Sequence, residues 1–169
     1  IPYICYMNLL IVVATKIEIT SNKLKQYPVL ITGVGMVNTA IALTQELMKK
    51  KYDLVINMGV SGSFSDQLKN GDVVEVIEDN FSEIGFENNF AFSKFTNFDL
   101  KTKFYNSSKT NLQLVRAITV NTVHGNNDSI SEIIERENPE IETMEGASVF
   151  KVCEKFNIPC IQIRSVSNK

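Results

Sequence analysis

Residues 28–40 of the chain read PVLITGVGMVNTA, and this stretch decides the fold class. The apolar run from Pro28 to Thr32 is typical of a short buried strand. Gly33 and Gly35 follow it directly, and apolar side chains then recur at helical spacing from Met36 to Lys50. A strand, a glycine turn and a helix in immediate succession predict one βα unit of an α/β fold.

The same alternation continues on both sides of this unit. A second helix is expected to begin at Ser129, where the sequence SISE forms a capping box, and to end before Pro139. A third is expected over Glu145–Phe156. Strands that alternate with helices imply a helix-covered, largely parallel sheet. Short apolar runs supply the other expected strands: Leu9–Ala14, Leu54–Met58, Val73–Ile77, Val115–Val120 and Cys160–Val166.

Composition bounds the class of protein. A chain of 169 residues, of which 44% are hydrophobic, can bury enough surface for one cooperative core, so a single domain is expected. A formal net charge of -2 with scattered lysines argues against a nucleic-acid partner and favours a small molecule. The apolar start of the chain is too short for a membrane span, so no membrane partner is expected.

The cysteines Cys5, Cys153 and Cys160 have neither the paired spacing of a disulfide framework nor neighbouring histidines for a zinc site. We therefore expect a cytoplasmic protein without a zinc site. Nothing in the sequence implies another metal or an organic cofactor. Residues 1–6 precede Met7 and are expected to be a non-native extension.

The stretch 87–111 breaks the alternation of strands and helices. It is rich in Asn, Lys, Ser and Thr but carries several phenylalanines. Two interpretations stay open. The stretch is either an ordered excursion or lid over a pocket, or a surface hairpin with its own small cluster. The phenylalanines are Phe90, Phe92, Phe95, Phe98 and Phe104.

Small and polar residues follow several of the expected strands. Gly35 lets the backbone approach a ligand at the start of a helix, although a purely structural tight turn explains the glycines equally simply. A dinucleotide fingerprint is disfavoured because Asn38 replaces its third glycine and no acid follows the next strand. Residues 57–64, NMGVSGSF, form a second candidate pocket wall at the carboxyl edge of the sheet.

Two further motifs place polar residues where a structural role alone does not obviously require them. Glu145, in IETMEGAS at residues 141–148, can accept two hydrogen bonds from a vicinal diol such as that of ribose. The alternative is an acid that stabilises a helix N-terminus. Polar residues also appear abruptly at the end of the last expected strand, in IRSVSN at residues 163–168.

Together these motifs resemble the nucleoside phosphorylase and nucleosidase superfamily and, within it, the futalosine hydrolases, which are nucleosidases of menaquinone biosynthesis. The resemblance covers nearly the whole chain and implies a three-layer α/β/α fold with a central mixed, largely parallel sheet. It is carried by LLIVVATKIEI (9–19), ITGVGMVNTA (31–40), INMGVSGSF (56–64), GDVVEV (71–76), TVNTVHG (119–125), ETMEGAS (142–148) and IPCIQIRSVSN (158–168).

The resemblance also implies roles for individual residues. Glu18 matches the general base that activates water, whereas the residues alone suggest a surface charge at a strand end. Glu145 matches the ribose-diol acceptor, and Asn168 the group that stabilises the departing base. His124 lies beside the base pocket but is assigned no catalysis. The other implied substrate-binding residues are Gly35, Val60, Ser61, Gly62, Val123, Met144 and Ser167.

Asn168 departs from the adenine-cleaving relatives, which carry an aspartate at this position. An asparagine can accept a hydrogen bond from a protonated N7 and donate one to a 6-oxo group. That pairing suits hypoxanthine or guanine, and futalosine carries hypoxanthine. Hydrolysis of futalosine to hypoxanthine and dehypoxanthinyl futalosine is therefore the favoured activity.

The alternatives are a methylthioadenosine/S-adenosylhomocysteine nucleosidase and a purine nucleoside phosphorylase. Phosphorolysis is disfavoured because phosphate needs cationic clamps, and neither Arg116 nor Arg136 is an obvious one. Arg164 could reach the site or anchor a neighbouring carboxylate, and the structural role is favoured. A truncated, non-catalytic nucleoside-binding domain is the alternative of another class. It is kept because the chain stops at Lys169, where relatives continue into a C-terminal helix. Relatives commonly pair, so a homo-oligomer is expected.

Overall fold

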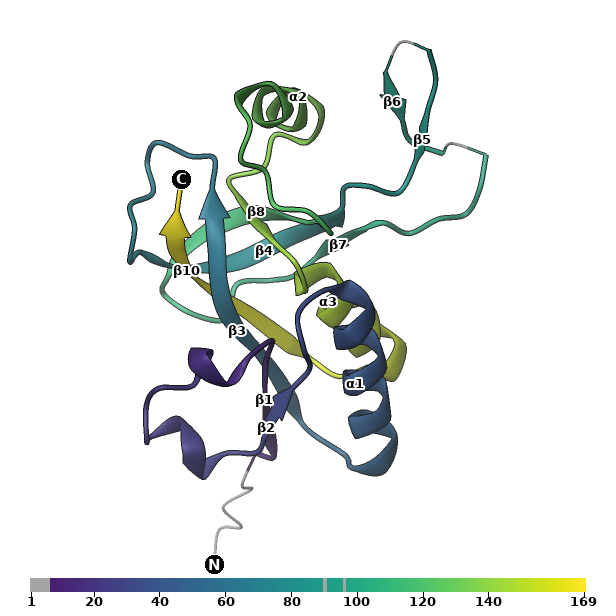
Figure 1. Ribbon diagram of the computed structural model, residues 1–169. Helices are drawn as coiled ribbons and strands as arrows, with labels where there is room; N and C mark the ends of the chain where they lie inside the picture. The colour runs from purple at the N-terminus through teal and green to yellow at the C-terminus, as the bar shows by residue number, and fades with distance from the viewer. Residues whose placement is uncertain (1–6, 90, 96) are drawn as a thin grey trace, which may run out of the picture.

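A mixed sheet of eight strands forms the centre of the computed structural model, which describes residues 7–89, 91–95 and 97–169 (Figure 1). Its strand order is β10-β4-β8-β9-β3-β1-β2, and β7 pairs with β4. The strands are β1 (Leu9–Val13), β2 (Val29–Ile31), β3 (Leu54–Ser63), β4 (Val73–Phe81), β7 (Lys103–Tyr105), β8 (Gln113–Thr119), β9 (Ile141–Thr143) and β10 (Cys160–Asn168).

Parallel pairing dominates this sheet. Strand β1 runs parallel to β2 and β3, β10 runs parallel to β3, and β8 runs parallel to β4 and β9. The antiparallel pairs are β10 with β4, β3 with β9 and β4 with β7. The predicted α/β fold with a mixed, largely parallel sheet is therefore confirmed.

The sheet closes partly on itself because β3 also pairs with β10. The register of this pair runs from Cys160 opposite Val55 to Asn168 opposite Gly62. The last residues of β10 therefore lie beside the glycine-rich end of β3. Strand β9 pairs with the same end of β3, which brings a third motif to this edge.

Two helices, α1 (Met36–Lys49) and α3 (Gly146–Phe156), pack against each other on one side of the sheet (Figure 1). Their apolar faces, with Leu43 on α1 and Val149 on α3, enter the main core. Helix α2 (Asn127–Glu137) lies at the opposite end and buries Ile133 in a second, smaller cluster. No helix among the described residues is both long and apolar enough to cross a membrane.

The predicted start of α2 at Ser129 is wrong by about half a turn. Asn126 is the N-cap, and its side chain accepts hydrogen bonds from the amides of Asp128 and Ser129 at 2.8 and 3.4 Å. An asparagine oxygen satisfies these otherwise unpaired amides as well as a serine does. The left-handed Asn138 then ends the helix directly before Pro139.

The stretch 87–111 contains part of a projecting hairpin formed by β5 (Phe86–Glu87) and β6 (Phe92–Ser93) (Figure 1). The Phe95 ring lies 5.4 Å from that of Phe86 and 5.3 Å from that of Phe98. Phe104 instead belongs to the main core on β7. This arrangement agrees with the surface-hairpin interpretation. Phe90 and residues 1–6, where a non-native extension is expected, lie outside the described residues.

Glu18 does not end a strand. It closes a short 3-10 helix, η1 (Lys16–Glu18), directly after β1. A second such helix, η2 (Leu24–Gln26), precedes β2. Thr15 and Glu18 form a reciprocal capping box around η1, which turns the chain at the edge of the sheet and fixes the glutamate there.

Candidate active site

A pocket of about 370 Å³ opens where the carboxyl ends of β1, β3, β9 and β10 meet. Open α/β sheets bind ligands at this edge, because the loops that leave the strands converge there. Nearly all the predicted site residues line it: Glu18, Val60, Ser61, Gly62, Val123, Met144, Glu145, Ser167 and Asn168. The lining residues that the sequence did not indicate are Ala14, Thr15, Ile17, Val34, Glu142 and Thr143.

Gly35, the remaining predicted residue, acts on the pocket through Glu145. Its backbone amide donates a hydrogen bond to Glu145 Oε1 at 3.1 Å. Gly35 is the N-cap of α1 and has a φ of 96°, a conformation that glycine adopts without strain. The glycine turn therefore holds a carboxylate of the protein rather than lining the pocket itself.

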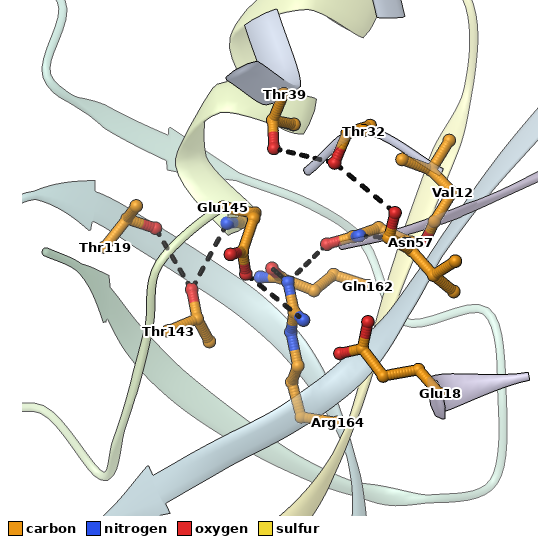
Figure 2. Close-up of polar contacts among 12 residues, drawn as sticks. Val12, Glu18, Thr32, Thr39, Asn57, Thr119, Thr143, Glu145, Gln162 and Arg164 are labelled. Carbon is orange, nitrogen blue, oxygen red and sulfur yellow. Dashed lines mark hydrogen bonds and ion pairs between the residues drawn. The ribbon is translucent and has the colours of Figure 1, made fainter. Parts of the chain in front are cut away.

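Glu18 presents its carboxylate to the pocket from η1. Its Oε2 accepts hydrogen bonds from the amide and hydroxyl of Thr15 at 2.7 and 3.2 Å. Its Oε1 lies 2.7 Å from the point that a Cβ on Gly59 would occupy. Figure 2 shows this carboxylate directed toward Arg164. The capping box thus holds one oxygen and leaves the other facing inward.

Arg164 lies beneath the two carboxylates and is 1% exposed. It donates to Asn57 Oδ1 and, at 2.9 Å, to Gln162 Oε1, while its Nη1 lies 4.0 Å from Glu145 Oε2 (Figure 2). Burial lowers the pKa of its guanidinium, and the charges of Glu145, Asp79 and Glu18 oppose that shift. A buried cation needs such partners, so this arginine anchors the acids of the site.

The opposite end of the pocket carries Ser167 and Asn168. Ser167 Oγ lies 3.1 Å from the carbonyl oxygen of Ser61 and 2.8 Å from Asn168 Oδ1. Asn168 Nδ2 lies 3.4 Å from the point that a Cβ on Gly62 would occupy. The absence of a side chain at Gly62 leaves room for this amide beside β3.

His124 and Glu142 form a pair beside Asn168. Glu142 is 3% exposed, and its carboxylate accepts from the His124 amide at 3.0 Å and lies 2.6 Å from His124 Nδ1. The His124 ring also contacts Phe64 edge-to-face at 5.9 Å. Sequence reasoning missed Glu142, although it stands in the same quoted motif as Glu145. Glu142 lines the pocket because the antiparallel pairing of β9 with β3 sets it opposite Gly62.

A larger pocket of about 610 Å³ lies between the β5–β6 hairpin and α2. Its walls carry the acids Glu83, Glu87 and Glu132 together with Arg136, whose guanidinium lies 4.1 Å from the centre of the Phe92 ring. It shares none of its lining residues with the pocket at the sheet edge. The described part of the hairpin is therefore not a lid over the candidate active site.

Comparisons with known proteins agree with this geometry. The model of the phosphorylase superfamily matches residues 11–169. A 5′-methylthioadenosine/S-adenosylhomocysteine nucleosidase of Shewanella frigidimarina is 31% identical over 168 residues, which cover 90% of this chain and 73% of that protein.

Solved structures share the fold. The chain superposes with a TM-score of 0.83 on a futalosine hydrolase mutant of Helicobacter pylori, at 19% identity and covering 96% of this chain and 86% of that one. The TM-score is also 0.83 for a Campylobacter jejuni 5′-methylthioadenosine/S-adenosylhomocysteine nucleosidase, at 20% identity and with the same two coverages. The fold is therefore nucleoside phosphorylase-like, as predicted. The chain belongs to the phosphorylase superfamily.

Proposed function

We propose that the protein hydrolyses the N-glycosidic bond of a purine nucleoside, with 5′-methylthioadenosine and S-adenosylhomocysteine as the first candidate substrates. The predicted class, an N-glycosyl hydrolase, agrees with the names of the relatives, which are nucleosidases. The observation that carries hydrolysis is the charge of the pocket. Glu18, Glu142 and Glu145 line it, and its described lining includes neither lysine nor arginine.

This charge distinguishes water from phosphate as the nucleophile. A phosphate dianion needs exposed cations with free donors. Arg164 is buried, and its Nη2 already donates to Asn57 and Gln162. Arg116 pairs with Glu140 away from the pocket, and Arg136 lies over Phe92. Water, in contrast, needs a base, which an ionised glutamate can supply.

The roles that we propose rest on the placement of the groups. Glu145, held by Gly35 and Arg164, accepts hydrogen bonds from the ribose hydroxyls. As the glycosidic bond lengthens and the sugar gains positive charge, the carboxylates of the pocket stabilise that charge. Water attacks the anomeric carbon as the bond from that carbon to the purine nitrogen breaks, and Glu18 takes the proton of this water. Asn168 donates a hydrogen bond to the departing purine, which takes up a proton from solvent.

The substrate assignment rests on relatives and on the pocket walls. Sequence relatives named as methylthioadenosine/S-adenosylhomocysteine nucleosidases match 26–31% of the aligned residues. Ile17, Val34, Val60, Val123 and Met144 give the pocket an apolar lining that suits a thioether substituent.

Futalosine is the second candidate, and Asn168 is the observation that favours it. The amide group at this position can donate to a 6-oxo group, which adenine lacks. The order of the two candidates is thus the reverse of the one that the sequence suggested. The sequence motifs favoured futalosine, whereas the relatives that match most of the chain carry the other name.

The test is release of free base, followed by chromatography. Methylthioadenosine, S-adenosylhomocysteine, futalosine and inosine are each incubated with and without phosphate. We expect phosphate-independent release from one of the first three, and loss of at least about 100-fold in Glu18→Gln. Glu135→Gln, an exposed acid on α2, is the matched control and should keep full activity. Release that depends on phosphate, or that survives in Glu18→Gln, would contradict the proposal.

A further inference from the structure

Asp79 is a buried acid on β4 that lies beneath the candidate active site without lining the pocket. It is fully buried, at 0% exposure. Its Oδ1 accepts hydrogen bonds from Thr119 Oγ1 at 2.9 Å and from the amide of Asn80 at 2.8 Å. Its Oδ2 accepts from Gln162 Nε2 at 2.8 Å. Both oxygens therefore act only as acceptors, as an ionised carboxylate does.

The first connection from Asp79 to the site runs through β10. Because Gln162 donates its amide to Asp79, its Oε1 is oriented to accept from Arg164 Nη2 at 2.9 Å. Arg164 in turn places its Nη1 4.0 Å from Glu145 Oε2. The orientation of the Gln162 amide, and through it that of the guanidinium, depends on an acceptor at position 79.

The second connection runs through the first turn of α3. Thr119 Oγ1, which donates to Asp79, accepts from the amide of Ala147 at 2.8 Å. Gly146 packs so closely on Asp79 and Gln162 that a Cβ there would overlap both side chains. Glu145 is the N-cap of this helix, so the same carboxylate fixes the backbone from which Glu145 projects.

Burial in this arrangement disfavours the ionised form of Asp79. Burial raises the pKa of Asp79 to about 6, although hydrogen bonds from Gln162, Thr119 and Asn80 and the charge of Arg164 oppose the shift. Arg164 on β10 is the charged group that acts on Asp79. Arg164 itself faces Glu145 at α3 and Glu18 on η1. Strand β7 contributes the uncharged Phe104 opposite Asp79. Buried acids with raised pKa values cluster at functional sites.

We propose that Asp79 is a positioning residue of the candidate active site, whose carboxylate holds both Arg164 and the first turn of α3 and so fixes Glu145. The role in catalysis rests on the proposed function. Asp79 touches no substrate in this account. It acts by supplying acceptors at both oxygens, which an asparagine cannot do because its amide nitrogen would face a donor on one side.

The decisive variant is Asp79→Asn, and Glu75→Gln is its matched control. Glu75 is a second fully buried acid on β4, at 0% exposure. Burial raises its pKa, but hydrogen bonds from Ser108, Lys109 and Thr110 outweigh burial and leave the pKa below its ordinary value. It therefore holds the 108–110 loop and has no connection to Arg164 or α3 among its described contacts.

For Asp79→Asn we expect kcat/KM for base release to fall about 10- to 100-fold at neutral pH, because the site groups lose their fixed geometry. Glu75→Gln should keep the wild-type value. In the wild type and in Glu75→Gln, base release should decline as pH falls through about 6, where Asp79 gains its proton. Asp79→Asn should lack this step in its pH profile.

Crystal structures of the three proteins give a readout that needs no activity. We expect the Glu145 carboxylate to move away from Arg164 in Asp79→Asn and to stay in place in Glu75→Gln. An unmoved Glu145, or an unchanged pH profile, would overturn the positioning role even if the protein is a nucleosidase. If the wild type releases no base, the proposed function fails, and the structures still decide whether Asp79 positions Glu145.

Gln162→Met is the variant that tests the proposal if Asp79→Asn does not fold. It removes the hydrogen bonds that link Asp79 to Arg164 through Gln162 and leaves the hydrogen bond from Thr119 to Asp79. We expect the same displacement of Arg164 from Glu145 and a smaller loss of kcat/KM. Wild-type activity and geometry in this variant would contradict the proposal.

Discussion

The backbone amide of Gly35 donates a hydrogen bond to Glu145 Oε1 at 3.1 Å, although 110 positions separate the two residues in the chain. One residue belongs to the glycine turn after β2, and the other precedes α3. Because α1 and α3 pack against each other, their N-termini meet at one edge of the sheet. The amide at the N-cap of α1 thus holds the carboxylate that we propose binds the ribose.

Gly35→Ala should weaken this contact. A Cβ at Gly35 has open space, so the expected loss of about 1–3 kcal/mol in the free energy of unfolding comes only from its backbone conformation, φ 96° and ψ 160°, which only glycine adopts readily. Displacement of the amide should also raise KM for the nucleoside. Gly71→Ala is the matched control, because Gly71 has a φ of 93° and equally open space but lies away from the pocket. Urea unfolding and steady-state kinetics of both variants check this. Equal KM values would show that Gly35 has no role in binding.

Gly59→Ala should remove activity by steric overlap. A Cβ at this position would overlap Arg164 and lie 2.7 Å from Glu18 Oε1. One of these groups must therefore move, and we expect at least a 10-fold decrease in kcat, about the effect of misplacing a catalytic group. Gly125→Ala, where a Cβ meets nothing within 4 Å, should be silent. Full activity of Gly59→Ala would mean that the placement of Glu18 beside Arg164 is not needed.

Asn168→Asp should change which base is released. The amide nitrogen of Asn168 can donate to a 6-oxo group, whereas a carboxylate there prefers a purine that presents donors. We expect the ratio of adenine to hypoxanthine release, from methylthioadenosine and futalosine, to rise by at least about 10-fold. Competition between the two substrates in one assay gives this ratio directly. An unchanged ratio would remove Asn168 from base recognition.

The stability of the protein should carry a pH dependence from Asp79. The pKa of this carboxyl is about 6 in the folded protein and 3.8 ordinarily, so the folded state binds the proton more tightly. Its contribution to stability is fully present below about pH 4 and is lost as pH rises through about 6. The loss is on the order of 3 kcal/mol.

In Asp79→Asn this part of the pH dependence should be absent. Denaturant unfolding of the wild type and the variant across this range measures the difference. A difference in unfolding free energy that stays constant with pH would show that Asp79 does not titrate there.

Local patterns predicted the elements well but not their exact ends. Apolar runs marked β1, β2, β3, β4, β8 and β10, because strands that pack against the core on one or both faces carry runs of apolar residues. The three-residue β9 was not among the apolar runs that marked strands, since so short a segment has no periodicity to detect. Asn126 was missed as the cap of α2 because SISE three residues later carries the stronger motif, while the backbone geometry selected the asparagine.

The sequence by itself determined the α/β class and most of the residues around the pocket. Small and polar residues directly after apolar strands can be recognised in the sequence, and parallel strands place them at one edge of the sheet. Only the tertiary structure decided how these groups are connected. The register of β3 against β10, and its pairing with β9, place Asn168 and Glu142 beside Gly62. Asp79, Gln162 and Arg164 form a buried chain beneath Glu145. Such contacts depend on distances between residues far apart in the chain, which spacing along a sequence does not encode.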